Sequence, residues 1–350
     1  MSLEFRHIAH SYRGAAGEVA ALTDVSLAAA GGEITCLLGA SGSGKSTLLG
    51  LAAGLLEVQR GEILVGGTPL AAPGHHPPPE ARGIGLVFQD GALFPHMTIA
   101  KNVAFGLPRA ERGAAEDWLA RVGLAGLGGR YPHELSGGQQ QRAALARAMA
   151  PRPRVLLMDE PFASVDIVLR RSLRRECRHL LRRAGTTVVM VTHDPEEALD
   201  LGDRIAVMEA GRIVQFGAPG ELRETPVSAG IGAMFGGAQV LRARISHGGI
   251  ETALGRWPVT AIAGNIPETD EFDLLMPAGA LDCEEDDEGF EALDVQALGG
   301  QPDGGEGRRV LLQARAGDGP IAIHTNSHVE EGKRYRVVPR LHSLRAFERG

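Results

Sequence analysis

A glycine-rich segment near the N-terminus has the residue types needed to hold a phosphate group. Residues 39–47 read GASGSGKST and follow the short apolar run 34–38. Glycines let the backbone curl so that successive N–H groups point toward one anion, and a helix that begins at Lys45 adds its positive N-terminal end. The ammonium group of Lys45 would reach the β- and γ-phosphates of a nucleotide, and the Ser46 hydroxyl would be offered to Mg²⁺. The residues predicted to bind the phosphates are Gly39, Ser41, Gly42, Gly44, Lys45, Ser46 and Thr47.

Two carboxylates, Asp159 and Glu160, follow a second apolar run at 155–158. Ligands of open α/β folds bind beyond the carboxyl ends of the strands, so these acids would lie near the phosphate loop. Asp159 is suited to hold Mg²⁺, and Glu160 could accept a proton from, or orient, an attacking water. Solvated acids at a strand end are a common alternative. The pairing with a phosphate loop favours hydrolysis of a nucleoside triphosphate.

The elements that must position these residues alternate along the first two thirds of the chain. Strand-length apolar runs alternate with stretches of helical period up to about residue 237, which is typical of an α/β fold with a largely parallel sheet. The sequence predicts buried strands at 34–38, 83–88, 155–158 and 186–192, helices at 45–55 and 168–183, and a proline-rich surface loop at 71–79.

The last third of the chain has a different pattern. Short apolar runs separated by Gly, Asp and Pro predict an all-β domain, built as a small barrel, over residues 238–350. Within it, the acidic segment 282–288 is interpreted as a turn or loop. The predicted strands are 240–245, 259–263, 274–276, 309–312 and 321–323.

Composition excludes several other classes of protein. The 350 residues carry a net charge of −7, which argues against nucleic acid as the main partner. The longest apolar runs have the length of strands, and the N-terminus has no secretory signal, so we expect a cytoplasmic chain. The three cysteines lack CxxC spacing, and reduced thiols are the simplest interpretation. His75, His76 and the acids at 284–287 could suggest metal sensing, but solvated surface residues explain them more simply.

Residues 135–139 read LSGGQ and lead through QQR into an alanine-rich helix. Here the chain resembles the ABC ATPases, whose signature sequence is LSGGQ. Ser136 and the backbone of Gly137 and Gly138 at a helix start would form a second anion site, with Gln139 beside it. The resemblance implies a P-loop NTPase cassette in which residues from about 90 to 154 form a helical subdomain. It also implies a head-to-tail dimer that holds two ATP molecules, with Mg²⁺, between the phosphate loop of one subunit and the signature of the other.

The same resemblance assigns roles to four further residues. Tyr12 matches the aromatic residue that stacks on adenine. Gln89 matches the glutamine that senses Mg²⁺ and the γ-phosphate. His193 matches the histidine that contacts the γ-phosphate and positions the water, so the implied catalytic set is Glu160, His193 and Gln89. Asp166 ends the segment 162–166, in which Val165 stands where the family more often has Leu; we expect this departure to tune the dimer contact.

Three segments, 94–104, 194–198 and 211–219, resemble the importer subunits that work with a separate permease and binding protein. The implied partners are a second cassette, most simply an identical copy, transmembrane permease subunits and, indirectly, a periplasmic or lipid-anchored solute-binding protein. Residues 88–106 would receive the coupling helices of the permease, at the cytoplasmic face of the inner membrane. Residues 238–350 look like the TOBE-type regulatory domain of many such importers. Export, or a non-transport ABC ATPase of DNA repair or translation, is the alternative; the latter usually carry tandem cassettes or long inserted arms.

Residues 132–142 are very similar to the ferric-iron importers, and ferric iron is therefore the first hypothesis for the solute. Sugar, polyamine, thiamine and molybdate subunits share most of this segment, and the cassette does not touch the solute, so these alternatives stay open.

Overall fold

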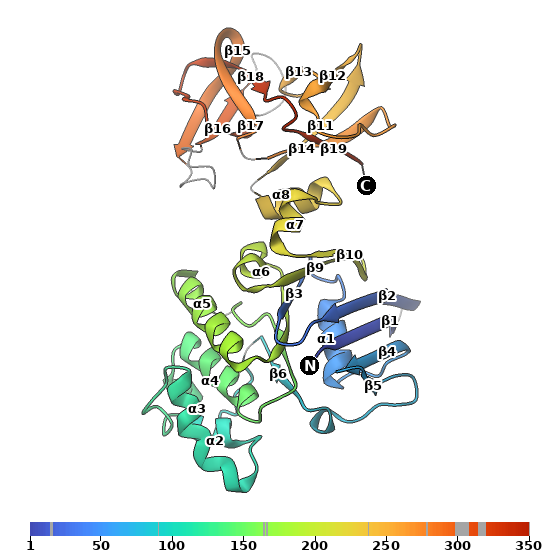
Figure 1. The fold of residues 1–350 in the computed structure, drawn as a ribbon. Coiled ribbons are helices and arrows are strands. Elements are labelled where there is room, and N and C mark those ends of the chain that lie inside the picture. Colours follow the sequence, from blue (N-terminus) through green and yellow to red (C-terminus); the bar gives the residue numbers. More distant parts are fainter. Residues whose placement is uncertain are drawn as a thin grey trace. The chain divides into compact units, whose positions relative to one another are not determined.

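The computed structural model describes residues 1–14, 17–89, 91–163, 165, 167–236, 238–277, 279–297, 308–313 and 320–349. The chain forms two compact units, Met1–Pro219 and Gly220–Gly350 (Figure 1). None of the helices in this described part combines the length and apolarity needed to cross a membrane.

The first unit is built around a six-stranded sheet in the order β10-β9-β3-β8-β7-β6. Neighbouring strands run parallel from β9 to β6, and β10 is antiparallel to β9. Every residue of β3 and β8 is buried, as expected for central strands covered on both faces. This confirms the predicted α/β class. The strands are β3 (Ile34–Leu38), β6 (Ile84–Val87), β7 (Val155–Asp159), β8 (Thr187–Thr192), β9 (Arg204–Glu209) and β10 (Arg212–Gly217).

A second, antiparallel sheet of the same unit has the order β2-β1-β4-β5. Helix α1 (Lys45–Ala53) packs in one hydrophobic core with both sheets: Leu48 and Leu51 share it with Phe5 of β1 and Leu157 of β7. Figure 1 shows α1 between the two sheets. The strands are β1 (Leu3–Gly14), β2 (Gly17–Ala29), β4 (Arg60–Val65) and β5 (Thr68–Ala71).

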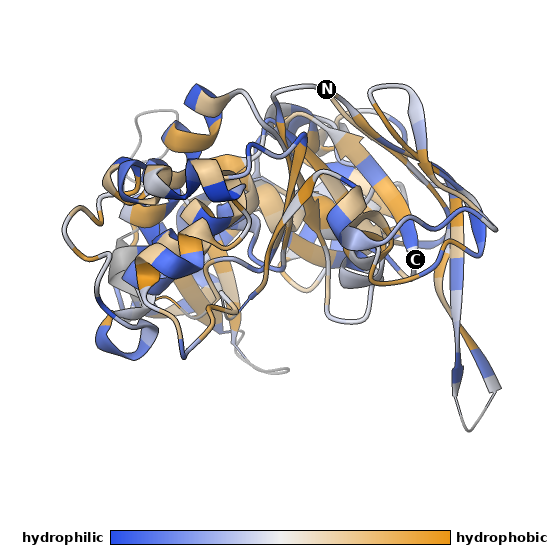
Figure 2. Ribbon diagram, turned by 90° about the horizontal axis from the view of Figure 1, so that it is seen from below, coloured by the Kyte–Doolittle hydropathy of each residue, from blue (hydrophilic) through white to orange (hydrophobic). Residues whose placement is uncertain are grey.

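The remaining helices of this unit lie on the other side of the central sheet (Figure 1). In Figure 2 the strands carry long hydrophobic stretches, whereas the helices alternate hydrophobic and hydrophilic residues, as expected for elements with one buried face. Residues described between β6 and β7 form helices and loops. The helices are α2 (Ile99–Ala104), α3 (Ala115–Arg121), α4 (Gly137–Met149), α5 (Ile167–Ala184) and α6 (Pro195–Leu201), with 3₁₀ turns at Pro79–Ala81, Arg109–Ala114 and Pro132–Glu134.

The second unit is strand-rich, as predicted, and its two sheets share one core that includes Trp257, Phe272, Val310 and Tyr335. The sheet orders are β13-β12-β11-β14-β19 and β16-β17-β15-β18. The elements are α7 (Pro219–Glu224), α8 (Ala229–Gly236), β11 (Gln239–Ser246), β12 (Gly249–Thr252), β13 (Gly255–Pro258), β14 (Glu271–Met276), β15 (Leu281–Ala297), β16 (Arg308–Gln313), β17 (Ile321–Thr325), β18 (Arg334–Pro339) and β19 (Arg345–Glu348).

The division at 219/220 precedes the domain boundary predicted at 237/238. Helix α8 ends at Gly236 and packs against β11, β14 and β19, so it belongs to the second compact unit although its sequence lacks strand character.

Two predictions for the second unit are wrong. Residues 259–263 begin with a 3₁₀ turn at Val259–Ala261 and contain no strand. The acidic segment 282–288 lies inside β15. Two of its acids pair with basic residues of β18 or just after it. Glu284 Oε2 lies 2.8 Å from Nη2 of Arg336, which faces it in the ladder. Asp282 Oδ1 lies 2.9 Å from Nη2 of Arg340, the residue that follows β18. Opposite charges on facing strands stabilise the pairing that a run of acids by itself disfavours.

Candidate functional site

The phosphate loop joins β3 to α1, and its glycines are needed for close packing. A Cβ on Gly39 would lie 2.3 Å from the carbonyl oxygen of Met208. Gly44 has φ 101° and caps the N-terminus of α1 in the left-handed conformation, which other residues rarely adopt. The backbone therefore approaches its neighbours more closely than any side chain permits.

Lys45 is the first residue of α1, and its side chain turns back into the loop. It is 5% exposed, and its Nζ donates to the carbonyl oxygens of Gly39 and Ala40, both at 2.8 Å. Burial lowers the pKa of Lys45, against the attraction of Glu160 and Asp159. The ammonium group is thus held at the centre of the loop, where phosphate oxygens would compete with the carbonyls for it.

Asp159 ends β7 and meets the first turn of α1. The Ser46 hydroxyl donates to Asp159 Oδ1 at 3.3 Å. Burial raises the pKa of Asp159, and the Ser46 hydrogen bond opposes that rise. A hydroxyl and a carboxylate are hard oxygen ligands, and Mg²⁺ usually takes only one or two such protein groups beside water and phosphate. The pair fits Mg²⁺.

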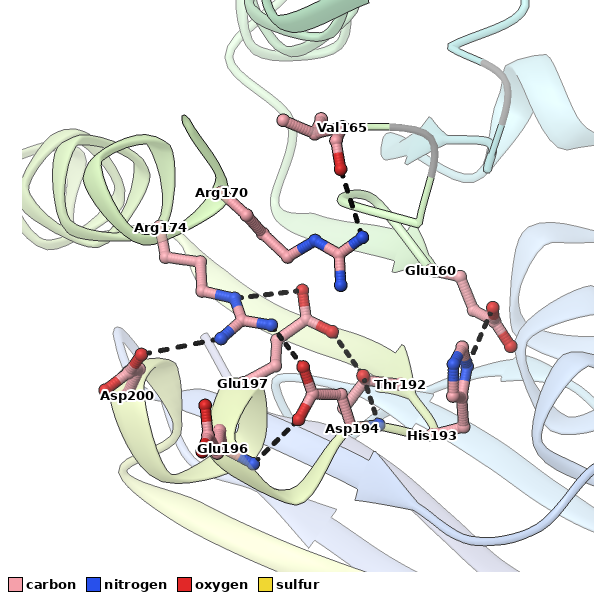
Figure 3. Close-up of polar contacts among 10 residues, drawn as sticks. All are labelled: Glu160, Val165, Arg170, Arg174, Thr192, His193, Asp194, Glu196, Glu197 and Asp200. Atoms are coloured by element: carbon pink, nitrogen blue, oxygen red, sulfur yellow. Dashed lines mark hydrogen bonds and ion pairs between the residues drawn. The ribbon is translucent and has the colours of Figure 1, made fainter. Parts of the chain in front are cut away.

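Glu160 and His193 form the second polar pair of this edge. They follow the adjacent parallel strands β7 and β8, and His193 Nδ1 lies 3.0 Å from Glu160 Oε2 (Figure 3). Glu160 has a positive φ of 42°, and its backbone N–H donates to the carbonyl oxygen of Val191 at 3.0 Å. The side chains are 23% and 59% exposed, so water can reach both. A carboxylate beside an imidazole can orient a water molecule and accept its proton.

Tyr12 lies against the same helix start. Its hydroxyl is 3.1 Å from Thr47 Oγ1, and the residue is 43% exposed. An aromatic ring open to solvent beside the phosphate loop is able to stack on a base. Gln89 is exposed just after β6, whose carboxyl end lies at the same sheet edge because β6 is parallel to β7. Asp166 lies outside the described residues.

The signature residues begin α4. Ser136 caps this helix: its hydroxyl accepts from the backbone N–H of Gln139 at 3.4 Å, and Gln139 Oε1 accepts from the Ser136 N–H at 2.9 Å. Ser136 and Gly137 are exposed, and Gly138 is half-buried. Figure 1 shows α4 and α1 on opposite sides of the central sheet. The signature and the phosphate loop of one chain therefore do not form one site.

A cavity of about 680 Å³ lies between α3, α4 and α5, and Trp118, Leu145 and Met158 line it. None of the predicted nucleotide-site residues lines it. Alternate residues of β7 face opposite ways, so Leu157 packs with α1 while Met158 faces this cavity. The cavity is separate from the edge that carries Asp159 and Glu160.

Sequence reasoning missed Arg174 of α5, together with its partners beside His193 (Figure 3). Helix α5 carries many arginines, and residue type alone does not show which of them is buried. The available signal was spacing: Arg170 and Arg174 fall in line with the buried Cys177 and Leu181 at steps of three and four, on the buried face of the helix.

Comparison with known proteins assigns the family. The sequence profile described as "ABC transporter" matches residues 22–163. The Fe(3+) ions import ATP-binding protein FbpC of Pseudomonas fluorescens is 46% identical over 71% of this chain and 72% of its own length. The spermidine/putrescine import ATP-binding protein PotA of Methylococcus capsulatus is 47% identical over 69% of this chain and 62% of its own length. The sulfate/thiosulfate import ATP-binding protein CysA 2 of Chromobacterium violaceum is 44% identical over 74% of this chain and 71% of its own length.

A solved structure agrees with these relatives. The ATP-binding cassette MJ0796, a dimer in a post-hydrolysis state bound to ADP and Pi, is 30% identical and superimposes with a TM-score of 0.54, over 62% of this chain and 98% of that one. The chain therefore belongs to the ABC transporter family, as an ATPase of the importer ATP-binding class.

Proposed function

We propose that this chain hydrolyses ATP at the edge formed by Lys45, Ser46, Asp159, Glu160 and His193, and thereby drives import of a solute through a membrane permease. The observation that carries the proposal is the 3.0 Å pair of Glu160 and His193 on the strand end next to Asp159. This edge brings a proton acceptor, Glu160, close to the first residues of α1, Lys45 and Ser46, which are suited to bind phosphate and Mg²⁺.

Before hydrolysis, the phosphate loop binds ATP. Lys45 and the loop N–H groups bind the β- and γ-phosphates, and Tyr12 stacks on adenine. Ser46 and Asp159 hold Mg²⁺, with Gln89 completing its surroundings. Bound there, Mg²⁺ would neutralise charge on the two terminal phosphates.

The chemical step then depends on Glu160. Its carboxylate accepts a proton from the attacking water, the water oxygen bonds to the γ-phosphorus, and the bond to the β-γ bridging oxygen breaks. His193 holds the carboxylate and the γ-phosphate in line. The products are ADP and inorganic phosphate.

The site is completed by a partner. Ser136, Gly137, Gly138 and Gln139 of a second copy would bind the γ-phosphate from the other side, with Asp166 at the contact. The dimeric structures of MJ0796 support the association of two cassettes. Closure of such a dimer, biased by the γ-phosphate, would be passed to permease subunits through the region 88–106. The strand-rich second unit would serve as a TOBE-like regulatory domain.

Ferric iron is the proposed solute. It rests on the similarity of residues 132–142 to ferric-iron importers and on relatives of that name in Pseudomonas fluorescens and Mesorhizobium japonicum. Polyamine is the second candidate, because the PotA relative is equally similar at 47% identity. Sulfate is a third, for the same kind of reason. The test measures uptake of labelled ferric iron, spermidine and sulfate by cells that lack this chain. Uptake of the transported solute alone should be lost in these cells and restored by the parent gene.

The test of the chemistry is Glu160→Gln. The amide keeps the size of the side chain but cannot accept the proton, so ATP should bind with unchanged affinity while turnover falls by about 100-fold or more. Size-exclusion chromatography with ATP should show a trapped dimer. Hydrolysis at the parental rate would exclude Glu160 as the base.

A further inference from the structure

A buried guanidinium group lies behind the Glu160–His193 pair. Arg174 of α5 is only 4% exposed, and three carboxylates surround it (Figure 3). Its Nη2 donates a hydrogen bond to Asp194 Oδ2. Two ion pairs are longer: Nε lies 3.8 Å from Glu197 Oε1, and Nη1 lies 3.6 Å from Asp200 Oδ2. All three acids belong to the segment that follows His193, so Arg174 ties their side chains to α5. Arg178 of the same helix adds a contact to the carbonyl oxygen of Asp200.

The residues on both sides of His193 are fixed by this cluster. The Thr192 hydroxyl donates to Glu197 Oε2 and accepts from the Asp194 N–H at 3.0 Å. Asp194 Oδ1 accepts from the Glu196 N–H at 2.9 Å and so caps α6. The backbone that carries His193 is therefore held by hydrogen bonds to Asp194 and Glu197, and both of these carboxylates form ion pairs with Arg174. The imidazole points the other way, to Glu160 (Figure 3).

The charges of the cluster depend on one another. Glu197 is 5% exposed, and burial raises its pKa against the attraction of Arg174. Burial would also raise the pKa of Asp194, but the hydrogen bond and charge of Arg174 hold it below its usual range. Without Arg174, Glu197 would be a buried carboxylate without its nearest cation, which a folded chain avoids by protonation or by moving the segment.

A second arginine on the same face extends the cluster toward Glu160. Arg170 lies one turn before Arg174 and donates to the carbonyl oxygen of Val165 at 3.0 Å. Val165 lies in the connection from Glu160 to α5. Helix α5 thus holds the chain segments that follow both members of the pair.

We propose that Arg174 is a positioning residue for ATP hydrolysis: it holds Asp194 and Glu197 against α5 and so sets where His193 meets Glu160. This inference rests on the function proposed for that pair. Arg174 touches neither Glu160 nor His193 in the described contacts, and it acts through the segment 192–197.

The test compares three variants of the full chain. Arg174→Met removes the charge and keeps the length of the side chain. Arg174→Lys keeps the charge but has no planar fork to reach several carboxylates. Arg182→Gln is the matched control, because Arg182 lies on the same helix, is 51% exposed and pairs with Asp203 outside the cluster.

Arg174→Met should lower kcat by about 10-fold or more while KM for ATP changes by less than about twofold, because the phosphate loop is untouched. Arg174→Lys should recover part of the loss, and Arg182→Gln should leave both constants unchanged. A parental kcat in Arg174→Met would overturn the proposal.

The position of His193 is read directly by NMR on protein labelled with ¹⁵N-histidine, its signals assigned by their loss in His193→Gln. We expect Arg174→Met to move the His193 ring signals and Arg182→Gln to leave them in place. A fall in kcat with unmoved His193 signals would mean that Arg174 supports only the fold. This readout needs no turnover. Absence of ATPase activity in the parent would refute the proposed function, and the His193 signals would still decide whether Arg174 positions His193.

If Arg174→Met does not fold, Glu197→Gln carries the test. The amide retains an acceptor for Thr192 and removes the charge that faces Arg174. It should shift the His193 signals and lower kcat in the same direction, and parental values of both would overturn the proposal.

Discussion

At the scale of single residues, Asp159 shows a conflict between binding and stability. Its carboxylate is placed where Ser46 can share a cation with it, 3.3 Å away. The same burial raises its pKa, because the charged form loses hydration and Glu160 adds repulsion. The residue is arranged for a cation, and its charge destabilises the fold without one.

We predict that Asp159→Asn stabilises the chain in the absence of Mg²⁺ and nucleotide. Because the folded pKa is raised, the native carboxylate costs stability once pH exceeds its ordinary value of 3.8, and below that value both states are protonated and the cost vanishes. The gain should therefore grow between acid and neutral pH. Each kcal/mol corresponds to about 2–4 °C in the thermal midpoint of a unit of this size.

The measurement is thermal unfolding in a chelator from acid to neutral pH, with Asp117→Asn as the control because Asp117 is exposed on α3. A pH-independent gain would contradict the electrostatic origin. The same variant should lose the stabilisation that Mg²⁺ with ATP confers on the parent.

At the scale of elements, α1 is anchored at both ends. Its first turn carries the side chains proposed to bind phosphate, and its last turn is closed by Arg82, which is 2% exposed. Arg82 Nη1 donates to the carbonyl oxygens of Leu51 at 2.7 Å and Ala52 at 3.0 Å, where a cation also complements the helix dipole. His76 lies 3.1 Å from Arg82 Nη2, so this loop histidine has a structural contact.

Gly54→Ala should destabilise the first unit through the end of α1. Gly54 has φ 84°, and a Cβ there would lie 2.5 Å from Arg82 Nε. The left-handed backbone alone costs about 1 kcal/mol, and displacing Arg82 from the helix carbonyls adds about 1–3 kcal/mol.

Gly67→Ala is the matched control, because Gly67 has φ 76° with nothing within 4 Å of an added Cβ. Urea unfolding should show a larger loss for Gly54→Ala than for Gly67→Ala. Equal losses would mean that Arg82 moves at no cost.

At the scale of the whole molecule, one chain offers two half-sites. The phosphate loop starts α1, the signature starts α4, and these helices lie on opposite sides of the central sheet (Figure 1). In the proposed head-to-tail pair, the loop of each copy would meet the signature of the other and make two equivalent sites. The pair, and not the single chain, would then be the catalytic unit.

Mixing two inactive variants tests this arrangement. Lys45→Ala removes the phosphate contact of one half-site, and Ser136→Arg blocks the other. A mixed dimer contains one doubly damaged site and one intact site, so an equimolar mixture should recover about a quarter of parental ATPase activity if the sites act independently. Each variant alone stays inactive, and a mixture without recovery would refute the head-to-tail site.

Much of the fold and of the candidate site was predictable, because the patterns involved are local. The glycine loop between an apolar run and a helix, the acids after 155–158 and the histidine after 186–192 each depend on neighbours in the chain. The parallel sheet then brings these strand ends to one edge, and the structure places β3, β8 and β7 side by side, an order that the sequence did not predict. The strand-rich character of the last third was also readable from the spacing of its short apolar runs.

Other features depend on partners far away in the sequence. The acidic segment 282–288 becomes a strand because the basic side chains of β18 face it. Helix α8 joins the second unit because it is apolar and packs against β14. Arg174 differs from its neighbours on α5 only because three acids from the segment after His193 surround it. Local sequence patterns thus determined the motifs, their order and the class of chemistry. Long-range packing and charge pairing decided which other residues hold those motifs in place, because such contacts join segments that are far apart in the sequence.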